Sequence, residues 1–140
     1  MSAIEIRGLA VDYPRTGTAL RGMDLTIGRD ERVALLGPSG SGKSTIARAV
    51  FGLLPIGTRV AGSIRLDGRE LVGLAPQEHR RLRGRAVGYV PQDPHAGCDP
   101  IRSVAHHVEE AWRAHGMKPP AGKVAALLGG QPARTRAAAL

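Results

Sequence analysis

The sequence predicts an α/β fold in which an antiparallel β layer accompanies a strand–loop–helix unit. Residues 3–7 and 19–27 alternate between apolar and polar side chains, which predicts two half-exposed strands. Residues 32–36 form a continuous apolar run instead, as is typical of a strand buried on both faces of a parallel sheet. A glycine-rich loop and an apolar helical face follow this run directly, which indicates a mixed α/β core.

The segments between these strands have the composition of loops and turns. Residues 12–18 contain Pro, Gly and Thr, which favour a loop between the two alternating strands. In the second strand Met23, Leu25 and Ile27 fall on one side, as period two requires. Residues 28–31 predict a turn that leads into the apolar run.

Residues 37–45 read Gly-Pro-Ser-Gly-Ser-Gly-Lys-Ser-Thr and match G-x-x-x-x-G-K-[ST] in full. The glycines allow successive N–H groups to converge on one anion, and the positive end of the next helix adds to the attraction. Lys43 can reach the β- and γ-phosphates of a nucleotide, and the Ser44 hydroxyl is placed to bind Mg²⁺. The alternative is an ordinary Gly/Ser-rich turn, but a lysine at a helix start is unfavourable unless an anion compensates it. The stretch therefore predicts a nucleotide phosphate site.

The helix after the loop is predicted from Ile46, Val50 and Leu54, which fall at i, i+4 and i+8, and we expect Pro55 to stop it. Residues 62–68 alternate and end in Asp-Gly, which predicts a strand entering a tight turn. Residues 76–83 predict a short polar helix that begins at its proline.

The later part of the chain contains a second candidate for a buried strand, at residues 86–90. Beyond it, Val104, Val108 and Trp112 define one face of a helix that begins at Ser103. Residues 123–128 predict one further short helical segment. On the first of these helices His106 and Glu110 stand at i and i+4, but a metal site needs more ligands, so we expect a solvated face.

The composition narrows the classes of partner. The net charge is +8 and 17 of the 20 basic residues are arginines, but they are scattered and no aromatic side chains interleave with them. Nucleic-acid binding through stacked bases is therefore not expected. Cys98 is the single cysteine, which excludes an intramolecular disulfide. No apolar run approaches the ~20 residues that span a bilayer, so any membrane association is expected to come through a partner.

Taken in order, these motifs resemble the amino-terminal half of an ABC-transporter ATPase subunit over residues 3–128. Residues 37–45 resemble the Walker A loop of that family, and residues 62–68 its β-hairpin. The stretch Val-Pro-Gln-Asp-Pro at 90–94 is similar to the Q-loop. Gln92-Asp93-Pro94, with a following Asp-Pro and Val104, most resembles the oligopeptide, dipeptide and nickel importer branch, although Cys98 departs from that branch's usual Leu-Asn-Pro.

The resemblance implies a P-loop NTPase (RecA-like) core with an antiparallel β subdomain, incomplete at its carboxyl end. It implies a partial ATPase core at 1–95, the start of a helical subdomain at 96–128 and a disordered tail at 129–140. It implies ATP and Mg²⁺ as cofactors, with Tyr13 stacking on adenine and Ser44 and Gln92 holding the metal. The implied nucleotide-binding residues are Tyr13, Gly37, Pro38, Ser39, Gly40, Ser41, Gly42, Lys43, Ser44, Thr45 and Gln92.

Several motifs of the family are absent from the sequence. There is no Leu-Ser-Gly-Gly-Gln signature, no apolar strand ending in Asp-Glu and no switch histidine. We therefore expect a truncated importer subunit that binds Mg-ATP but does not hydrolyse it alone, and we assign no catalytic residue. The implied partners are membrane subunits and a second ATPase subunit, at the cytoplasmic face of the inner membrane.

Two other functions remain open at this point. One is a non-enzymatic nucleotide-binding remnant or regulatory module. The other is a small P-loop kinase, which is disfavoured because no later Asp-rich apolar strand or Arg-bearing lid follows.

Overall fold

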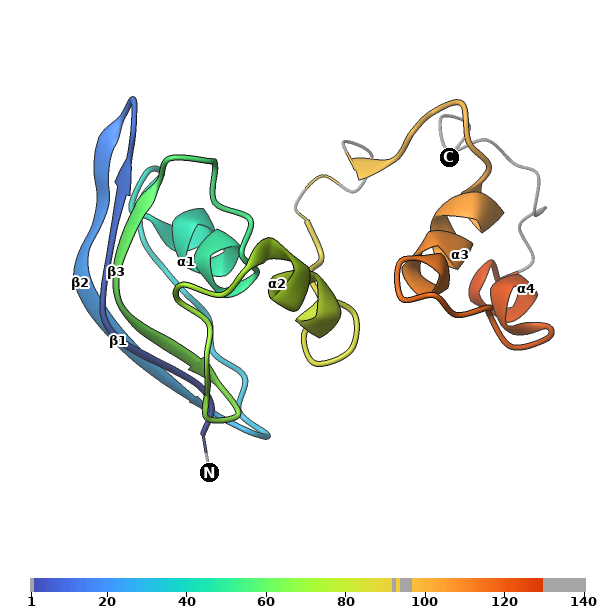
Figure 1. Ribbon diagram of the computed structural model, residues 1–140, viewed down its shortest axis with the longest axis horizontal. Coiled ribbons are helices and arrows are strands. Elements are labelled where there is room, and N and C mark those ends of the chain that lie inside the picture. The colour runs from blue at the N-terminus through green and yellow to red at the C-terminus, as the bar shows by residue number, and fades with distance from the viewer. Residues whose placement is uncertain (1, 92, 94–96, 130–140) are drawn as a thin grey trace. The chain divides into compact units, whose positions relative to one another are not determined.

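The structure is a computed structural model, and it describes residues 2–91, 93 and 97–129. The chain divides into two compact units, Met1–Arg83 and Gly84–Leu140. The first unit contains the β-strands together with α1 and α2, and the second contains α3 and α4 (Figure 1).

The first unit is built on a four-stranded antiparallel sheet in the order β2-β1-β3-β4. Strand β1 (Ser2–Tyr13) pairs with β2 (Gly17–Gly28) on one side and with β3 (Arg59–Leu66) on the other. The short strand β4 (Arg69–Glu70) pairs with β3. The antiparallel layer predicted from the alternating sequence is confirmed.

Strands β1 and β2 are both longer than the alternating stretches 3–7 and 19–27 predicted. An irregularity in β1 interrupts the alternation, so the sequence pattern does not reveal where the strand continues. The pairing of β1 shifts register between Ile6 and Leu9, and both of these side chains are buried although they stand three residues apart. Such a bulge breaks the period of two that reveals a strand in sequence. The loop predicted at 12–18 is correspondingly reduced to a turn at 14–16.

The core of the first unit lies on one face of the sheet, against which α1 (Lys43–Val50) is placed (Figure 1). Ile6, Leu9 and Val11 of β1 are at most 1% exposed. Aliphatic side chains of the other elements complete this core, as the low aromatic content requires: Leu20, Ile46, Ala49, Val50, Ile64, Leu66 and Leu71. Burial of this kind contributes roughly 25 cal/mol per Å² of apolar surface, so the core is the main stabilising term.

The prediction of a buried strand at residues 32–36 is wrong. This segment has no regular secondary structure, and its Val33, Leu35 and Leu36 side chains are 39%, 39% and 91% exposed. A strand is held by hydrogen bonds to neighbouring strands, and none of the described strands runs beside this segment. The local pattern is that of a buried strand, but the pairing that would make it one is missing from the described residues.

The strand predicted at residues 86–90 is also wrong, for the same reason. Within the described chain Val87 is bridged to Arg83 only, and the Gly84 N–H donates to the Val87 carbonyl at 2.8 Å across the turn between them. Val90 is 87% exposed and has no neighbouring strand among the described elements.

Helix α1 ends earlier than Leu54 and Pro55 predicted, because Gly52 ends it. Gly52 has φ +61°, its N–H donates to the Ala49 carbonyl at 3.1 Å, and the Leu53 N–H donates to the Arg48 carbonyl at 2.8 Å. This pair of bonds is a Schellman motif, in which a left-handed residue satisfies the last carbonyls of a helix. A side chain at position 52 would also lie 2.5 Å from the His79 ring.

The Asp-Gly hairpin and the proline-initiated helix are confirmed. Asp67 and Gly68 have φ of +48° and +81°, as a type I′ turn requires, and they join β3 to β4. Helix α2 (Pro76–Leu82) begins at its proline.

Glu70 closes the β3–β4 hairpin with its carboxylate. Its Oε1 accepts the Ile64 N–H at 2.9 Å and the Val72 N–H at 3.1 Å, and Oε2 accepts the Ser63 hydroxyl. Partial burial by itself would raise the pKa of Glu70, but these hydrogen bonds outweigh burial and lower that pKa.

The second unit contains α3 (Val104–Arg113) and α4 (Lys123–Leu127), both at positions that the sequence predicts. Ser103 caps α3, because its Oγ accepts the His106 N–H at 3.2 Å. The tail predicted at 129–140 lies outside the described residues except for Gly129. None of the helices in the described chain is long and apolar enough to cross a membrane.

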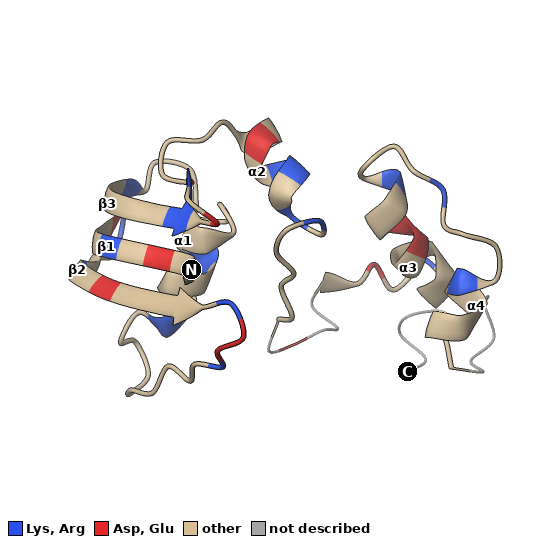
Figure 2. Cartoon of the chain, turned by 90° about the horizontal axis from the view of Figure 1, so that it is seen from below, with Lys and Arg blue, Asp and Glu red and all other residues tan. Residues whose placement is uncertain are grey.

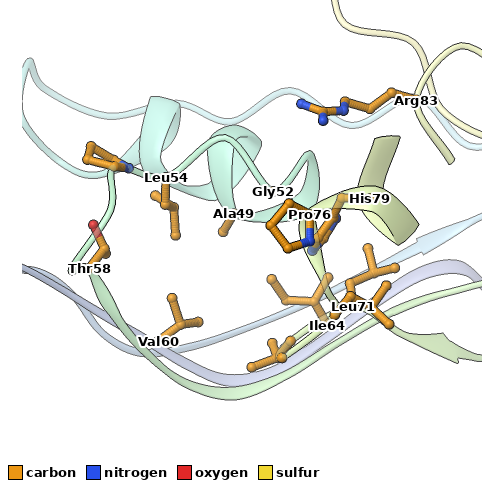
Figure 3. A pocket seen from close by; sticks show the side chains of 14 residues that line it. Ala49, Gly52, Leu54, Thr58, Val60, Ile64, Leu71, Pro76, His79 and Arg83 are labelled. Atoms are coloured by element: carbon orange, nitrogen blue, oxygen red, sulfur yellow. The ribbon is translucent and has the colours of Figure 1, made fainter. Parts of the chain in front are cut away.

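A cavity of about 230 Å³ lies between α1, β3 and α2 in the first unit (Figure 3). Its lining includes Ala49, Val60, Ile64, Leu71 and His79. Burial lowers the pKa of His79, and the charges of nearby arginines lower it further, while a backbone hydrogen bond and Glu78 oppose the shift only partly.

We predict that the free energy of unfolding falls as the pH is lowered through about 6.5, the ordinary pKa of a histidine. The unfolded chain takes up this proton first because the pKa of His79 is lower in the fold, so stability is complete above this pH. Below the folded-state pKa the loss levels off. Urea unfolding at a series of pH values measures it. A His79→Gln variant should flatten the profile in this window, and an unchanged slope in that variant would contradict the assignment.

Candidate phosphate-binding site

The glycine-rich loop meets α1 at Gly42, whose backbone is left-handed with φ +92°. This residue is buried beneath β2, and a Cβ there would lie 2.5 Å from Cδ2 of Leu20 and 2.9 Å from the Ala19 carbonyl oxygen. Only glycine therefore suits the position, both for its dihedral angles and for its space. The junction anchors the start of α1 to the sheet.

Lys43 folds back over the loop that precedes it. Its Nζ donates to the carbonyl oxygens of Gly37 and Pro38, each at 2.7 Å, and to the Ser41 hydroxyl at 3.2 Å. The amine therefore lies directly beside the loop that the sequence assigns to phosphate. All three contacts are exposed to solvent, so an anion can exchange with them.

The first turn of α1 contributes no anionic side chain to its amino end. There is no acidic residue in its first turn, and Gly42 provides no side-chain cap. The first N–H groups of a helix have no partner within the helix, and they attract negative charge. The residues present thus fit a bound phosphate group.

Ser44 and Thr45 have opposite environments although they are adjacent. Ser44 is exposed, and its hydroxyl has no hydrogen-bond partner among the described residues. Thr45 is only 7% exposed, and its Oγ1 lies 3.1 Å from the Tyr13 hydroxyl. Ser44 is therefore available to a metal ion, whereas Thr45 faces the protein.

Tyr13 stands at the end of β1 and reaches the first turn of α1 through that hydrogen bond. It borders a hollow of about 450 Å³ that is lined by Asp12, Tyr13, Pro14, Gly17, Gly57 and Arg59. An aromatic ring that borders a hollow and is hydrogen-bonded to the first turn of α1 is suited to stacking on a nucleobase. The structure thus brings Tyr13 and the loop together within one unit.

Three further site residues were predicted from the sequence: Ser39, Gly40 and Gln92. Ser39 and Gly40 lie in the loop, where the Ser41 N–H donates to the Pro38 carbonyl at 3.3 Å. Gln92 lies outside the described residues.

Asp12 and Arg59 are two residues of the hollow that sequence reasoning missed. They face each other across β1 and β3 in the register of the sheet. Arg59 had no distinguishing signal, because it is one of many scattered arginines and the register of β3 against β1 is a tertiary property. Asp12 could have been found through its position next to Tyr13.

The His106–Glu110 pair has no metal-site geometry. The two His106 ring nitrogens lie within hydrogen-bonding distance of arginines, Nε2 at 3.4 Å from Arg102 and Nδ1 at 3.2 Å from Arg113. Among the described residues no group of three or more His, Cys, Asp or Glu side chains could hold a metal ion.

Lys and Arg residues are distributed over strands, loops and helices of the described chain and are interspersed with Asp and Glu residues (Figure 2). Arg29 pairs with Asp67 at 2.7 Å, and Arg69 pairs with Glu78 at 2.9 Å. Exposed ion pairs of this kind contribute about 0–1 kcal/mol each to the free energy of unfolding, so they add little to the stability of the fold.

We predict that Gly42→Ala weakens binding of tripolyphosphate and lowers the free energy of unfolding by about 1 kcal/mol or more, from the left-handed backbone and from the clash with Leu20. Calorimetric titration and urea unfolding measure the two effects. Gly40→Ala is the matched control, because it also has positive φ (+82°) but nothing within 4 Å of its Cβ. Equal losses in both variants would show that contact with β2 is unimportant.

Comparison with known proteins agrees with this geometry. The family described as "ABC transporter" matches residues 20–138. "Oligopeptide transport ATP-binding protein OppD" of Mycobacterium tuberculosis is 44% identical over 126 residues, covering 88% of this chain and 20% of the relative. "Nickel import ATP-binding protein NikD" of Pseudomonas putida is 36% identical, covering 83% of this chain and 43% of the relative. This chain therefore spans less than half the length of either relative.

A solved structure shows the same likeness. The "Structure of a bacterial Atm1-family ABC exporter with ATP bound" has a TM-score of 0.60 and 27% identity, and it covers 78% of this chain and 18% of its own. The α/β fold class with an antiparallel β subdomain and the resemblance to the oligopeptide and nickel branch are confirmed. The chain belongs to the ABC transporter family.

Proposed function

We propose that this chain is part of the ATP-binding subunit of a peptide- or nickel-type ABC importer and that it binds Mg-ATP through residues 37–45. The observation that carries the proposal is the start of α1, where Lys43 lies across a glycine loop and the first turn of the helix contains no acidic residue. A helix start without its own anion and with a lysine beside it is suited to phosphate.

Each residue has a role in the proposed complex. Lys43 leaves the carbonyl oxygens of the loop and donates to the β- and γ-phosphates instead. Ser44 and Gln92 hold Mg²⁺, which neutralises phosphate charge when it is bound. Tyr13 stacks on the adenine in the hollow at the end of β1.

The importer assignment is supported by two relatives, which are named as ATP-binding proteins of oligopeptide transport and of nickel import. We infer that membrane subunits and a second ATPase subunit are the partners. Contact with those membrane subunits would hold the chain at the cytoplasmic face of the inner membrane.

We further propose that the 140-residue polypeptide does not hydrolyse ATP alone. Phosphoryl transfer to water needs a carboxylate that holds the metal and a group that orients the water. The sequence contains no apolar strand that ends in Asp-Glu.

We predict that the chain binds Mg-ATP and that Lys43→Ala weakens this binding about 10- to 150-fold, because charge-assisted hydrogen bonds contribute roughly 1.5–3 kcal/mol. Titration with a fluorescent ATP analogue measures it. Lys118→Ala is the matched control, since this exposed lysine lies in the other unit. Binding that is absent, or that does not depend on Lys43, would overturn the proposal.

We predict that phosphate release at saturating Mg-ATP stays at the level of the Lys43→Ala variant. The physical reason is that the polypeptide has no carboxylate pair for metal and water. Turnover that clearly exceeds this level and is lost in Lys43→Ala would show that the 140 residues suffice for hydrolysis.

A further inference from the structure

We propose that Thr45 is a positioning residue for the nucleobase: its hydroxyl holds the Tyr13 ring at a fixed place relative to the phosphate loop. The inference rests on the proposed function, because it concerns how the same nucleotide site is organised. It assigns to Thr45 a role toward the base, whereas the sequence placed this residue only within the phosphate loop.

The contact joins two parts of the chain that are far apart in sequence. Tyr13 ends β1 and Thr45 lies on the first turn of α1, and their hydroxyl oxygens are 3.1 Å apart. Thr45 is buried as a whole residue, at 7% exposure. A hydroxyl removed from water needs a partner, and the Tyr13 hydroxyl supplies it.

The position of Tyr13 explains why its ring needs such a restraint. The residue stands at the last pair of the β1–β2 ladder, opposite Gly17, and the turn at 14–16 follows it. Beside it is the hollow that would receive the base. A tyrosine at a strand end can rotate about its side-chain bonds, and a hydrogen bond at the tip of the ring removes this freedom.

The consequence is a link between the two halves of the nucleotide site. Thr45 follows Lys43 by two residues, so the backbone that carries the lysine also carries the anchor of the ring. A ring that is already ordered loses less conformational freedom when a base stacks on it. The hydrogen bond should therefore strengthen binding of ATP but not binding of a phosphate chain that has no base.

The test compares Mg-ATP with Mg-tripolyphosphate by calorimetric titration of the full chain and four variants: Thr45→Val, Thr45→Ser, Tyr13→Phe, and Thr45→Val combined with Tyr13→Phe. Thr45→Val and Tyr13→Phe should each lower the affinity for ATP by about 2- to 12-fold, the range of one neutral hydrogen bond. The double variant should be no weaker than either single one, and Thr45→Ser should bind ATP like the original chain. Tripolyphosphate carries no base, so Tyr13→Phe should leave its affinity unchanged, and Thr45→Val should lower that affinity less than it lowers the affinity for ATP.

Several results would overturn the inference. They are an unchanged ATP affinity in Thr45→Val and Tyr13→Phe, multiplied losses in the double variant, and equal losses for both ligands, which would mean that Thr45 serves the phosphates. Thr58→Val is the control for loss of a hydroxyl, since Thr58 Oγ1 is buried without a partner among the described residues, and it should bind ATP normally.

Failure of the proposed function gives a different pattern. If the original chain binds neither ligand, or if Lys43→Ala binds both ligands as tightly as the original chain does, the proposed nucleotide site is wrong. The inference about Thr45 then fails as well. If Lys43→Ala loses both ligands while the Thr45 and Tyr13 variants behave like the original chain, only the inference fails. Thermal melts of each variant show whether it folds, and Tyr13→Phe and Thr45→Ser test the bond even if Thr45→Val does not.

Discussion

The close packing of Gly42 beneath β2 is the constraint on which the rest of the site depends. There is no space for a Cβ between this residue and Leu20, and the backbone here is left-handed, so the position requires glycine for both reasons. The turn starts α1 directly after the loop and presents its unpaired N–H groups toward residues 37–42. Lys43 is the next residue, so its amine returns over the same loop. One packing contact thus orders both the helix end and the cation.

The sheet contributes the other half of the site through the length of β1. This strand pairs on both sides and continues past a bulge to Tyr13, where its end lies beside the first turn of α1. The bulge allows the side chains of Ile6 and Leu9 to be buried together. After the bulge the Val11 side chain is also buried in the core. The aliphatic core and the proposed nucleotide site therefore share one element. A change in the packing of β1 would move the ring as well as the core.

The exposed apolar segments 32–36 and 86–90 show the limit of a local pattern. Both have the composition of buried strands, yet within the described chain neither has a neighbour that completes its hydrogen bonds. A helix satisfies its backbone within itself, whereas a strand depends on residues elsewhere. This difference explains why the positions of α1, α2, α3 and α4 could be predicted while these two strands were wrong. It also explains why α1 ends at Gly52 and not near Pro55, since the αL cap is supported by packing on His79.

The sequence by itself determined the glycine-rich motif, the Asp-Gly hairpin, the positions of the helices and the family, because each depends on residue types at short fixed spacing. It also indicated Tyr13, through the family resemblance. Only the tertiary structure decided which residues share the hollow with Tyr13 and that Thr45 Oγ1 lies beside the Tyr13 hydroxyl. Strand register and the approach of α1 to β1 join positions that are far apart in the sequence, such as Tyr13 and Arg59, which are 46 residues apart. Contacts of this kind follow from how the sheet and helix pack, and no spacing along the chain records them.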